Sequence, residues 1–104
     1  MSDRLASLRR LAEARPDDPR ARFGLAIELL SAGRTAEGVD ELRAYLEVGK
    51  DEGNAWGRLA AALVELGRVE EAIAAWERGI DVALDHGHPT MAEEFRMALE
   101  TIER

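Results

Sequence analysis

Hydrophobic residues between positions 55 and 82 recur with helical spacing in two successive segments. Apolar residues at i, i+3, i+4 and i+7 fall on one face of an α-helix. The first segment places four residues on such a face: Trp56, Leu59, Ala60 and Leu63. The second places five: Val69, Ala72, Ile73, Trp76 and Ile80. Gly67 lies between them, where glycine readily adopts the left-handed conformation that ends a helix. The pattern predicts two antiparallel helices joined by a short turn.

The same pattern occurs a second time, 34 residues earlier. Gly33-Arg34 and Gly67-Arg68 are separated by this spacing, and small and apolar residues match at the same offset. The matched pairs are Ala21 and Ala55, Leu25 and Leu59, Ala26 and Ala60, and Leu29 and Leu63. These are positions that packing constrains most. The chain is therefore expected to contain two copies of a helix hairpin, residues 19–52 and 53–86.

The segment before the first copy is expected to form a capping helix. Leu5, Leu8 and Leu11 form an apolar stripe over residues 3–14, so residues 1–18 are interpreted as an N-terminal capping segment. Asp18 suits the N-cap of the helix that follows, and Pro19 suits its first position.

The segment after the second copy is expected to form another helix within residues 87–104. Thr90 and Glu93 have the spacing of a capping box. One face of this helix carries Met91, Phe95, Ala98 and Ile102. Terminal elements of stacked repeats are atypical because each must cover an otherwise exposed core, so this helix is interpreted as a C-terminal cap.

These residues carry a family resemblance. The second copy resembles a tetratricopeptide repeat, with aromatic, large and small residues at the positions of its pattern: Trp56, Leu59, Ala60, Leu63, Ala72, Trp76 and Gly79. The first copy departs from the pattern, since Phe23 lies one residue late and Tyr45 replaces a small residue. The resemblance implies an all-α fold, in which antiparallel hairpins form a right-handed superhelix of about six helices in one domain over residues 1–104. It also implies that Trp76 lies in the core.

Composition narrows the classes of partner. The formal net charge is −7, which disfavours binding to nucleic-acid phosphates and to anionic membranes. There is no cysteine and no apolar run long enough to span a bilayer, so we expect a cytoplasmic protein. Thirteen arginines against the single Lys50, with abundant alanine, hint at a bacterial origin.

Catalytic chemistry has little support in the sequence. The hydroxyl residues lie in no nucleophile-elbow motif, and the glycines form no phosphate-binding loop, so neither an enzyme nor a cofactor is expected. Asp85, His86 and His88 group potential metal ligands. The alternative is that His86 complements a helix C-terminus and His88 is a turn residue, and we favour this alternative over a metal site.

Binding to a protein or peptide remains as the expected function. Members of the resembled family hold peptides in a concave groove formed by the first helix of each hairpin. The resemblance places the groove positions at ten residues: Arg20, Phe23, Ile27, Leu30, Asn54, Gly57, Arg58, Ala61, Val64 and Glu65. The resemblance implies that four of these apolar side chains form a strip that faces outward: Phe23, Ile27, Leu30 and Val64. Arg20 and Arg58 would orient the ligand.

Three occupants of this strip are possible on the sequence alone: a peptide ligand, a second copy in a homodimer or larger assembly, or the C-terminal helix itself. One ligand type is not expected. Repeats that clamp the C-terminal carboxylates of heat-shock chaperones use lysine and asparagine at positions that correspond here to Phe23, Ile27 and Arg58.

Overall fold

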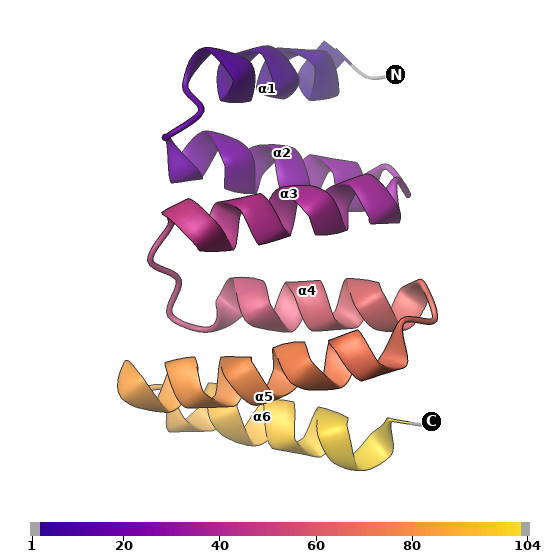
Figure 1. The fold of residues 1–104 in the computed structure, drawn as a ribbon, viewed down its shortest axis with the longest axis vertical. Coiled ribbons are helices and arrows are strands. Elements are labelled where there is room, and N and C mark those ends of the chain that lie inside the picture. The colour runs from indigo at the N-terminus through magenta and orange to yellow at the C-terminus, as the bar shows by residue number, and fades with distance from the viewer. Residues whose placement is uncertain (1–2, 103–104) are drawn as a thin grey trace. The chain divides into compact units, whose positions relative to one another are not determined.

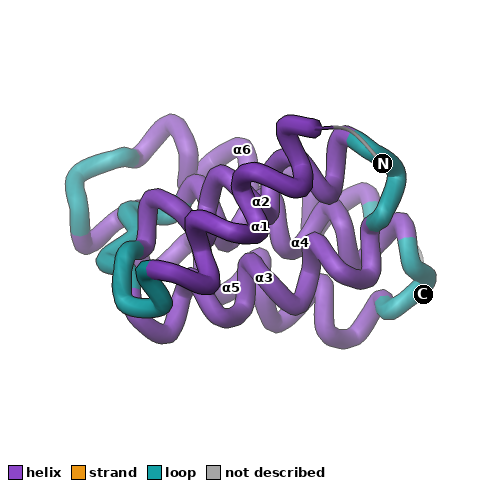
Figure 2. The backbone as a smooth tube through the Cα atoms, turned by 90° about the horizontal axis from the view of Figure 1, so that it is seen from above, coloured by secondary structure: helices purple, strands orange, loops and turns teal. Residues whose placement is uncertain are grey.

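The computed structural model describes residues 3–102, and this part of the chain folds into helices without a strand (Figures 1 and 2). There are six helices in this range: α1 (Asp3–Ala14), α2 (Pro19–Ser31), α3 (Thr35–Val48), α4 (Asn54–Glu65), α5 (Val69–Asp85) and α6 (Pro89–Thr101). The predicted all-α class is confirmed. None of these helices is long and apolar enough to cross a bilayer. The chain divides into two compact units, Met1–Gly49 and Lys50–Arg104.

The first unit contains α1, α2 and α3, with α2 packed against both of the others. Its largest fully buried side chains are Leu5, Leu29, Val39 and Leu42. The prediction that Leu11 lies on the buried stripe of α1 is wrong, because its side chain is 43% exposed and Ala12 is buried instead. At 100° per residue Ala12 falls almost directly over Leu5, whereas Leu11 points about 120° away from it.

Both hairpin turns show the same backbone solution. Gly33 and Gly67 have φ of 79° and 75°, in the left-handed region. The next backbone N–H in each turn reaches back across the helix end, from Arg34 to Leu29 O at 2.9 Å and from Arg68 to Leu63 O at 2.8 Å. This bond satisfies a carbonyl that the helix leaves without a partner. The two glycines, 34 residues apart, therefore occupy equivalent positions in two structurally similar turns.

The predicted helix starts are partly right. Asp18 caps α2 as expected: its Oδ1 accepts the backbone N–H of Arg20 at 3.0 Å, and Pro19 is the first helical residue. The capping box at Thr90 and Glu93 is wrong. The helix α6 begins at Pro89, and its N-cap is His88, two residues before Thr90 and without a side-chain cap bond. Proline suits the first helical position because that position makes no use of its missing N–H and its fixed φ matches the helix.

The second unit contains α4, α5 and α6, with α5 packed against both neighbours. The core predicted from the two stripes is largely confirmed, since Leu59, Ala60, Leu63, Ala72 and Ile73 are buried. The C-terminal helix adds the buried side chains of Ala92 and Phe95. The expectation that Trp76 is a core residue is wrong: Trp76 is only half-buried. Its ring lies beside that of Phe95, with centroids 5.0 Å apart.

Tyr45, which replaces a small residue of the repeat pattern, is explained by the aromatic packing around it. Position 45 corresponds by the 34-residue offset to Gly79 in the second copy. In the first unit the Tyr45 ring packs on Phe23, with centroids 5.0 Å apart. In the second unit a Cβ at Gly79 would lie 2.9 Å from Cε2 of Phe95, so α6 supplies a ring where the first copy uses its own tyrosine. The two copies thus fill related space with aromatic rings from different helices.

An ion-pair cluster on the first unit predicts a pH effect on stability. Glu37 accepts hydrogen bonds from Arg34 at 2.8 Å and from Arg9 at 3.4 Å. The hydrogen bonds from Arg34 hold the pKa of Glu37 below its ordinary value of 4.5. A carboxylate whose pKa is depressed by folding stabilises the protein above its unfolded pKa, and this stabilisation is lost as pH falls through the folded pKa. Glu37→Gln should therefore lower the melting temperature near neutral pH and have little effect at acidic pH.

Thermal melts of the wild type and Glu37→Gln at about pH 7 and about pH 3 test this expectation. The exposed Glu47 of the same helix provides the control variant, Glu47→Gln. An equal difference between wild type and Glu37→Gln at both pH values would contradict the assignment.

Candidate protein-binding groove

An apolar groove of about 530 Å³ lies within the second unit, between α4, α5 and α6. Its walls come from all three helices: Ala61, Val64, Val69, Trp76, Ala98, Thr101 and Ile102. We call this the α4–α6 groove. It lies where α4 ends, α5 begins and α6 ends, and these three helix ends are on the same side of the unit in Figure 1.

The packing of Phe95 determines where the groove begins along α4. Phe95 is 7% exposed, and its ring occupies the space left by two glycines. A Cβ at Gly57 would lie 2.8 Å from Cε1 and Cζ of Phe95, and one at Gly79 would lie 2.9 Å from Cε2. The aromatic ring can approach both helices only because these positions lack a side chain. One turn further along α4, Ala61 and Val64 are exposed, and they form a wall of the groove.

Because α6 packs over part of α4, the predicted binding residues of the second unit fall into three groups: one that is buried, two that line the groove and three that are exposed outside it. Gly57 is buried beneath Phe95 and presents no surface to a ligand in this structure. Ala61 and Val64 line the groove. Three polar residues are exposed but are not among the groove walls: Asn54, Arg58 and Glu65. Arg58 Nε donates to Asn54 Oδ1 at 3.0 Å.

The predicted binding residues of the first unit have other contacts. Phe23 packs on Tyr45. Leu30 lies over α3, where a Cβ at Gly38 would be 2.6 Å from its Cδ2. Ile27 is half-buried, and Arg20 is exposed at the start of α2, with its Nε 3.5 Å from Asp18 Oδ1. Two of the apolar side chains expected to face outward thus contribute to the packing between α2 and α3.

Sequence reasoning missed five groove residues: Val69, Trp76, Ala98, Thr101 and Ile102. Val69 and Trp76 were placed on the buried stripe of α5, and Ala98 and Ile102 on the buried stripe of the C-terminal helix. Helical periodicity identifies the face that packs, but it does not show where packing along that face ends. A signal was present in Gly57 and Gly79, since two glycines within predicted helices indicate that another group approaches closely.

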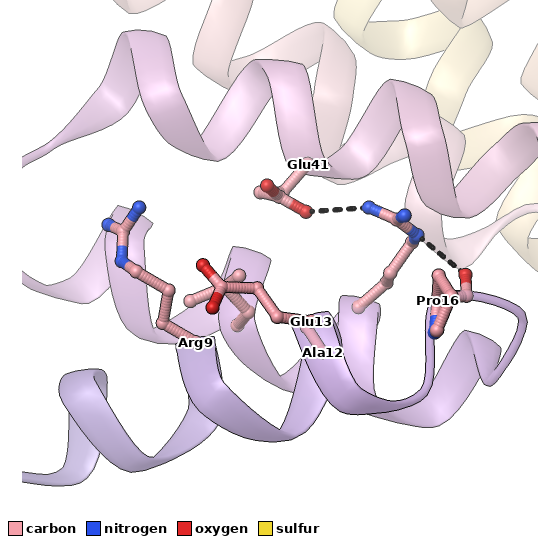
Figure 3. A pocket seen from close by; sticks show the side chains of 7 residues that line it. Arg9, Ala12, Glu13, Pro16 and Glu41 are labelled. Carbon is pink, nitrogen blue, oxygen red and sulfur yellow. Dashed lines mark hydrogen bonds and ion pairs between the residues drawn. The ribbon is translucent and has the colours of Figure 1, made fainter.

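A smaller cavity of about 130 Å³ in the first unit has a different character (Figure 3). Its lining includes four charged residues, and two of them pair across it: Arg22 contacts Glu41 at 3.3 Å and also donates to Pro16 O at 3.2 Å. Arg9 and Glu13 extend into the same space in Figure 3. A cavity of this size holds only a few water molecules, so we interpret it as part of the charged packing between α1, α2 and α3.

The histidine cluster does not assemble a metal site in the described part of the chain. Among residues 3–102 there is no group of three or more His, Asp or Glu side chains placed to hold a metal ion. His88 Nε2 lies 2.6 Å from Glu52 Oε1, and this hydrogen bond lowers the pKa of Glu52. The contact joins the segment before α4 to the start of α6.

The helix hairpins and their shared glycine turns define the class of protein. Repeated antiparallel helix pairs with a 34-residue period are characteristic of helical repeat proteins. The family model for the tetratricopeptide repeat matches residues 5–47 and 23–89, and the chain belongs to this family. Membership implies the helical-repeat architecture expected from the sequence, and tetratricopeptide repeats are generally protein–protein interaction modules. Comparison with curated proteins gave no significant match.

Proposed function

We propose that this protein is a binding module that holds an apolar segment of a partner protein in the α4–α6 groove. The observation that carries the proposal is an open groove of about 530 Å³ with apolar walls, in a repeat family that generally binds proteins. Grooves of this kind accept extended or helical segments with apolar anchor residues. Val64 is 43% exposed and Trp76 is half-buried, so both would lose contact with water when a partner side chain enters.

The exposed polar residues around α4 have a supporting role in this proposal. Asn54, Arg58 and Glu65 would contact the partner outside the groove, and Arg58 would help to orient it. Arg20 and Ile27 on α2 remain candidates for additional contacts made by the first unit. Gly57, Phe23 and Leu30 would act indirectly, by shaping the helices that carry the contact residues.

A second candidate function is self-association through the same surface. The observation that favours it is the exposure of two apolar side chains at the end of α4: Val64, which lines the groove, and Leu66, which directly follows the helix. Exposed apolar groups of this kind are often covered by a partner subunit. In that case the protein would be a structural homodimer or an assembly subunit, and a dimer would persist in solution without any added ligand.

We further propose that the protein is not an enzyme, takes no cofactor and acts in the cytoplasm of a bacterium. The support is the non-catalytic character of the repeat family, the lack of cysteine, and the predominance of arginine over lysine. The acidic balance supports a protein partner rather than nucleic acid or membrane. Phe23, Ile27 and Arg58 at the clamp positions argue against a chaperone carboxylate ligand.

Selection from a phage-displayed peptide library tests the binding function and does not require the partner to be identified first. Peptides selected on the full chain should bind Val64→Glu at least about tenfold more weakly, because the substitution buries a charge in an apolar groove. Isothermal titration calorimetry measures both affinities, and light scattering shows whether the free protein is a monomer.

Leu11→Glu provides a matched control. Leu11 and Val64 are both 43% exposed, but Leu11 lies on α1 and outside the groove. Peptides that lose affinity equally for the two variants, or that bind Val64→Glu as well as wild type, would contradict the proposed site. A stable dimer that Val64→Glu dissociates would favour self-association instead.

A further inference from the structure

The acidic charge of the chain is concentrated in the unit that contains the groove. Residues 50–104 contain 12 Asp and Glu against 6 Lys and Arg, a net charge of −6. Residues 1–49 contain 9 acidic and 8 basic residues, a net charge of −1. The two values add up to the net charge of −7 of the whole chain. A partner that approaches the second unit therefore meets a strongly negative potential.

Two acidic residues are sequence neighbours of groove-wall residues. Glu65 follows the wall residue Val64, and Glu100 precedes Thr101; both side chains are exposed. The C-terminal end of α6 forms part of the wall and carries the negative end of the helix dipole. The N-terminal end of α5, at Val69, also lies close to the groove and carries the positive end of that helix dipole. The first turn of α5 contains Glu70 and Glu71, whose negative charges oppose it.

Nearby arginines do not reverse this balance, because three of them, Arg58, Arg68 and Arg96, stand against five acidic residues, Glu65, Glu70, Glu71, Glu93 and Glu100. Arg68 Nε lies 2.6 Å from Glu71 Oε2, and Arg96 lies 3.3 Å from Glu93. Arg58 donates to Asn54 at 3.0 Å. The surroundings of the groove thus combine apolar walls with a net negative charge, which is complementary to an apolar segment flanked by cations.

We infer that the α4–α6 groove accepts the apolar side chains of a basic partner segment, one in which leucine-like residues are flanked by lysine or arginine. This inference rests on the proposed function and specifies its ligand. The apolar anchors fill the space between Val64, Trp76 and Ile102, and the flanking cations lie toward Glu65, Glu100 and the C-terminal end of α6. The complementary charge also accelerates encounter and makes the affinity depend on salt.

Three short peptides separate the apolar and the electrostatic requirements. The first is acetyl-Lys-Lys-Leu-Leu-Lys-Lys-amide, the second replaces each lysine with glutamate, and the third replaces each leucine with serine. Each is titrated into the full chain, and the indole N–H signals of Trp56 and Trp76 are followed by ¹⁵N–¹H NMR. The Trp76 signal is assigned by its disappearance in Trp76→Phe.

The lysine–leucine peptide should shift the Trp76 signal and bind at least about tenfold more tightly than the glutamate–leucine peptide at about 50 mM salt. This ratio should shrink at about 500 mM salt, because exposed charges are then screened. The lysine–serine peptide should leave the Trp76 signal in place. The double variant Glu65→Gln/Glu100→Gln should reduce the ratio of the affinities for the lysine–leucine and glutamate–leucine peptides. The control is the double variant Asp81→Asn/Asp85→Asn, near the other end of α5, which should change this ratio less.

The outcomes distinguish this inference from the proposed function. Equal or tighter binding of the glutamate–leucine peptide overturns the inference and favours the orienting role of Arg58, while the groove remains the binding site. An equal shift of Trp76 by the lysine–serine peptide overturns the inference because the anchors would then be unnecessary. Library-selected peptides that bind through Val64 but carry no basic residues also overturn it. Failure of every peptide in both experiments rejects the proposed function itself.

Discussion

Replacing Phe95 with alanine is expected to destabilise the second unit by about 3–5 kcal/mol, the largest effect of any substitution considered for this chain. Phe95 is 7% exposed, and its ring contacts the positions of Gly57 and Gly79 as well as the Trp76 ring. Truncation would leave a cavity that the two glycines cannot fill, since they have no side chains to move into it. Urea unfolding followed by circular dichroism and by tryptophan fluorescence measures the loss.

Met97→Ala on the same helix is the control for Phe95→Ala. Met97 is 57% exposed, so its truncation should change the free energy of unfolding by no more than about 0.5 kcal/mol. If Phe95→Ala unfolded at the same urea concentration as Met97→Ala, α6 would not be packed as the structure shows. The groove would then lack one of its walls.

The second large effect is expected at Gly79, and its sign should depend on Phe95. In the wild type a new Cβ would lie 2.9 Å from Cε2 of Phe95 and 3.1 Å from Cβ of Trp56. Overpacking of this kind costs about 1–3 kcal/mol, which exceeds the roughly 1 kcal/mol by which alanine is preferred to glycine within a helix. Gly79→Ala should therefore destabilise the wild type.

In the Phe95→Ala background the same substitution should stabilise the protein. The clash with the ring is removed, part of the cavity is filled, and the helix preference for alanine remains. The remaining contact, 3.1 Å to Cβ of Trp56, needs a shift of only a few tenths of an ångström, for which the missing ring leaves room. A double-mutant cycle from urea unfolding gives the coupling between the two positions. Additive effects, with Gly79→Ala destabilising in both backgrounds, would show that the ring of Phe95 does not occupy the space above Gly79.

The fold was predictable because the residues that determine it repeat. Leucine and alanine stripes at matched positions predicted the helices, and Gly33 and Gly67 predicted the turns. Errors arose where a shift of one or two residues decides the outcome. Leu11 and Ala12 are adjacent in sequence but lie about 100° apart around α1, and the N-cap of α6 is His88 rather than Thr90.

The site was less predictable than the fold because it depends on how far α6 extends over α4. The family pattern placed Gly57, Ala61 and Val64 among the groove positions, and Phe95 covers the first of them while leaving the other two in a groove. Phe23 and Leu30 pack within their own unit because Tyr45 and Gly38 alter the sizes of their neighbours. Contacts between residues distant in the sequence decide these outcomes, and a repeat register does not specify them.

The central claim is that a partner segment enters the groove between Val64, Trp76 and Ile102. The most direct test is intermolecular nuclear Overhauser effects between a library-selected peptide and the methyl groups of the full chain. The proposed function predicts contacts from the peptide to Val64 and Ile102 and to the indole ring of Trp76, with none to Leu11. Contacts confined to Leu11 or to other residues of the first unit, with no signal from Val64 or Trp76, would contradict it.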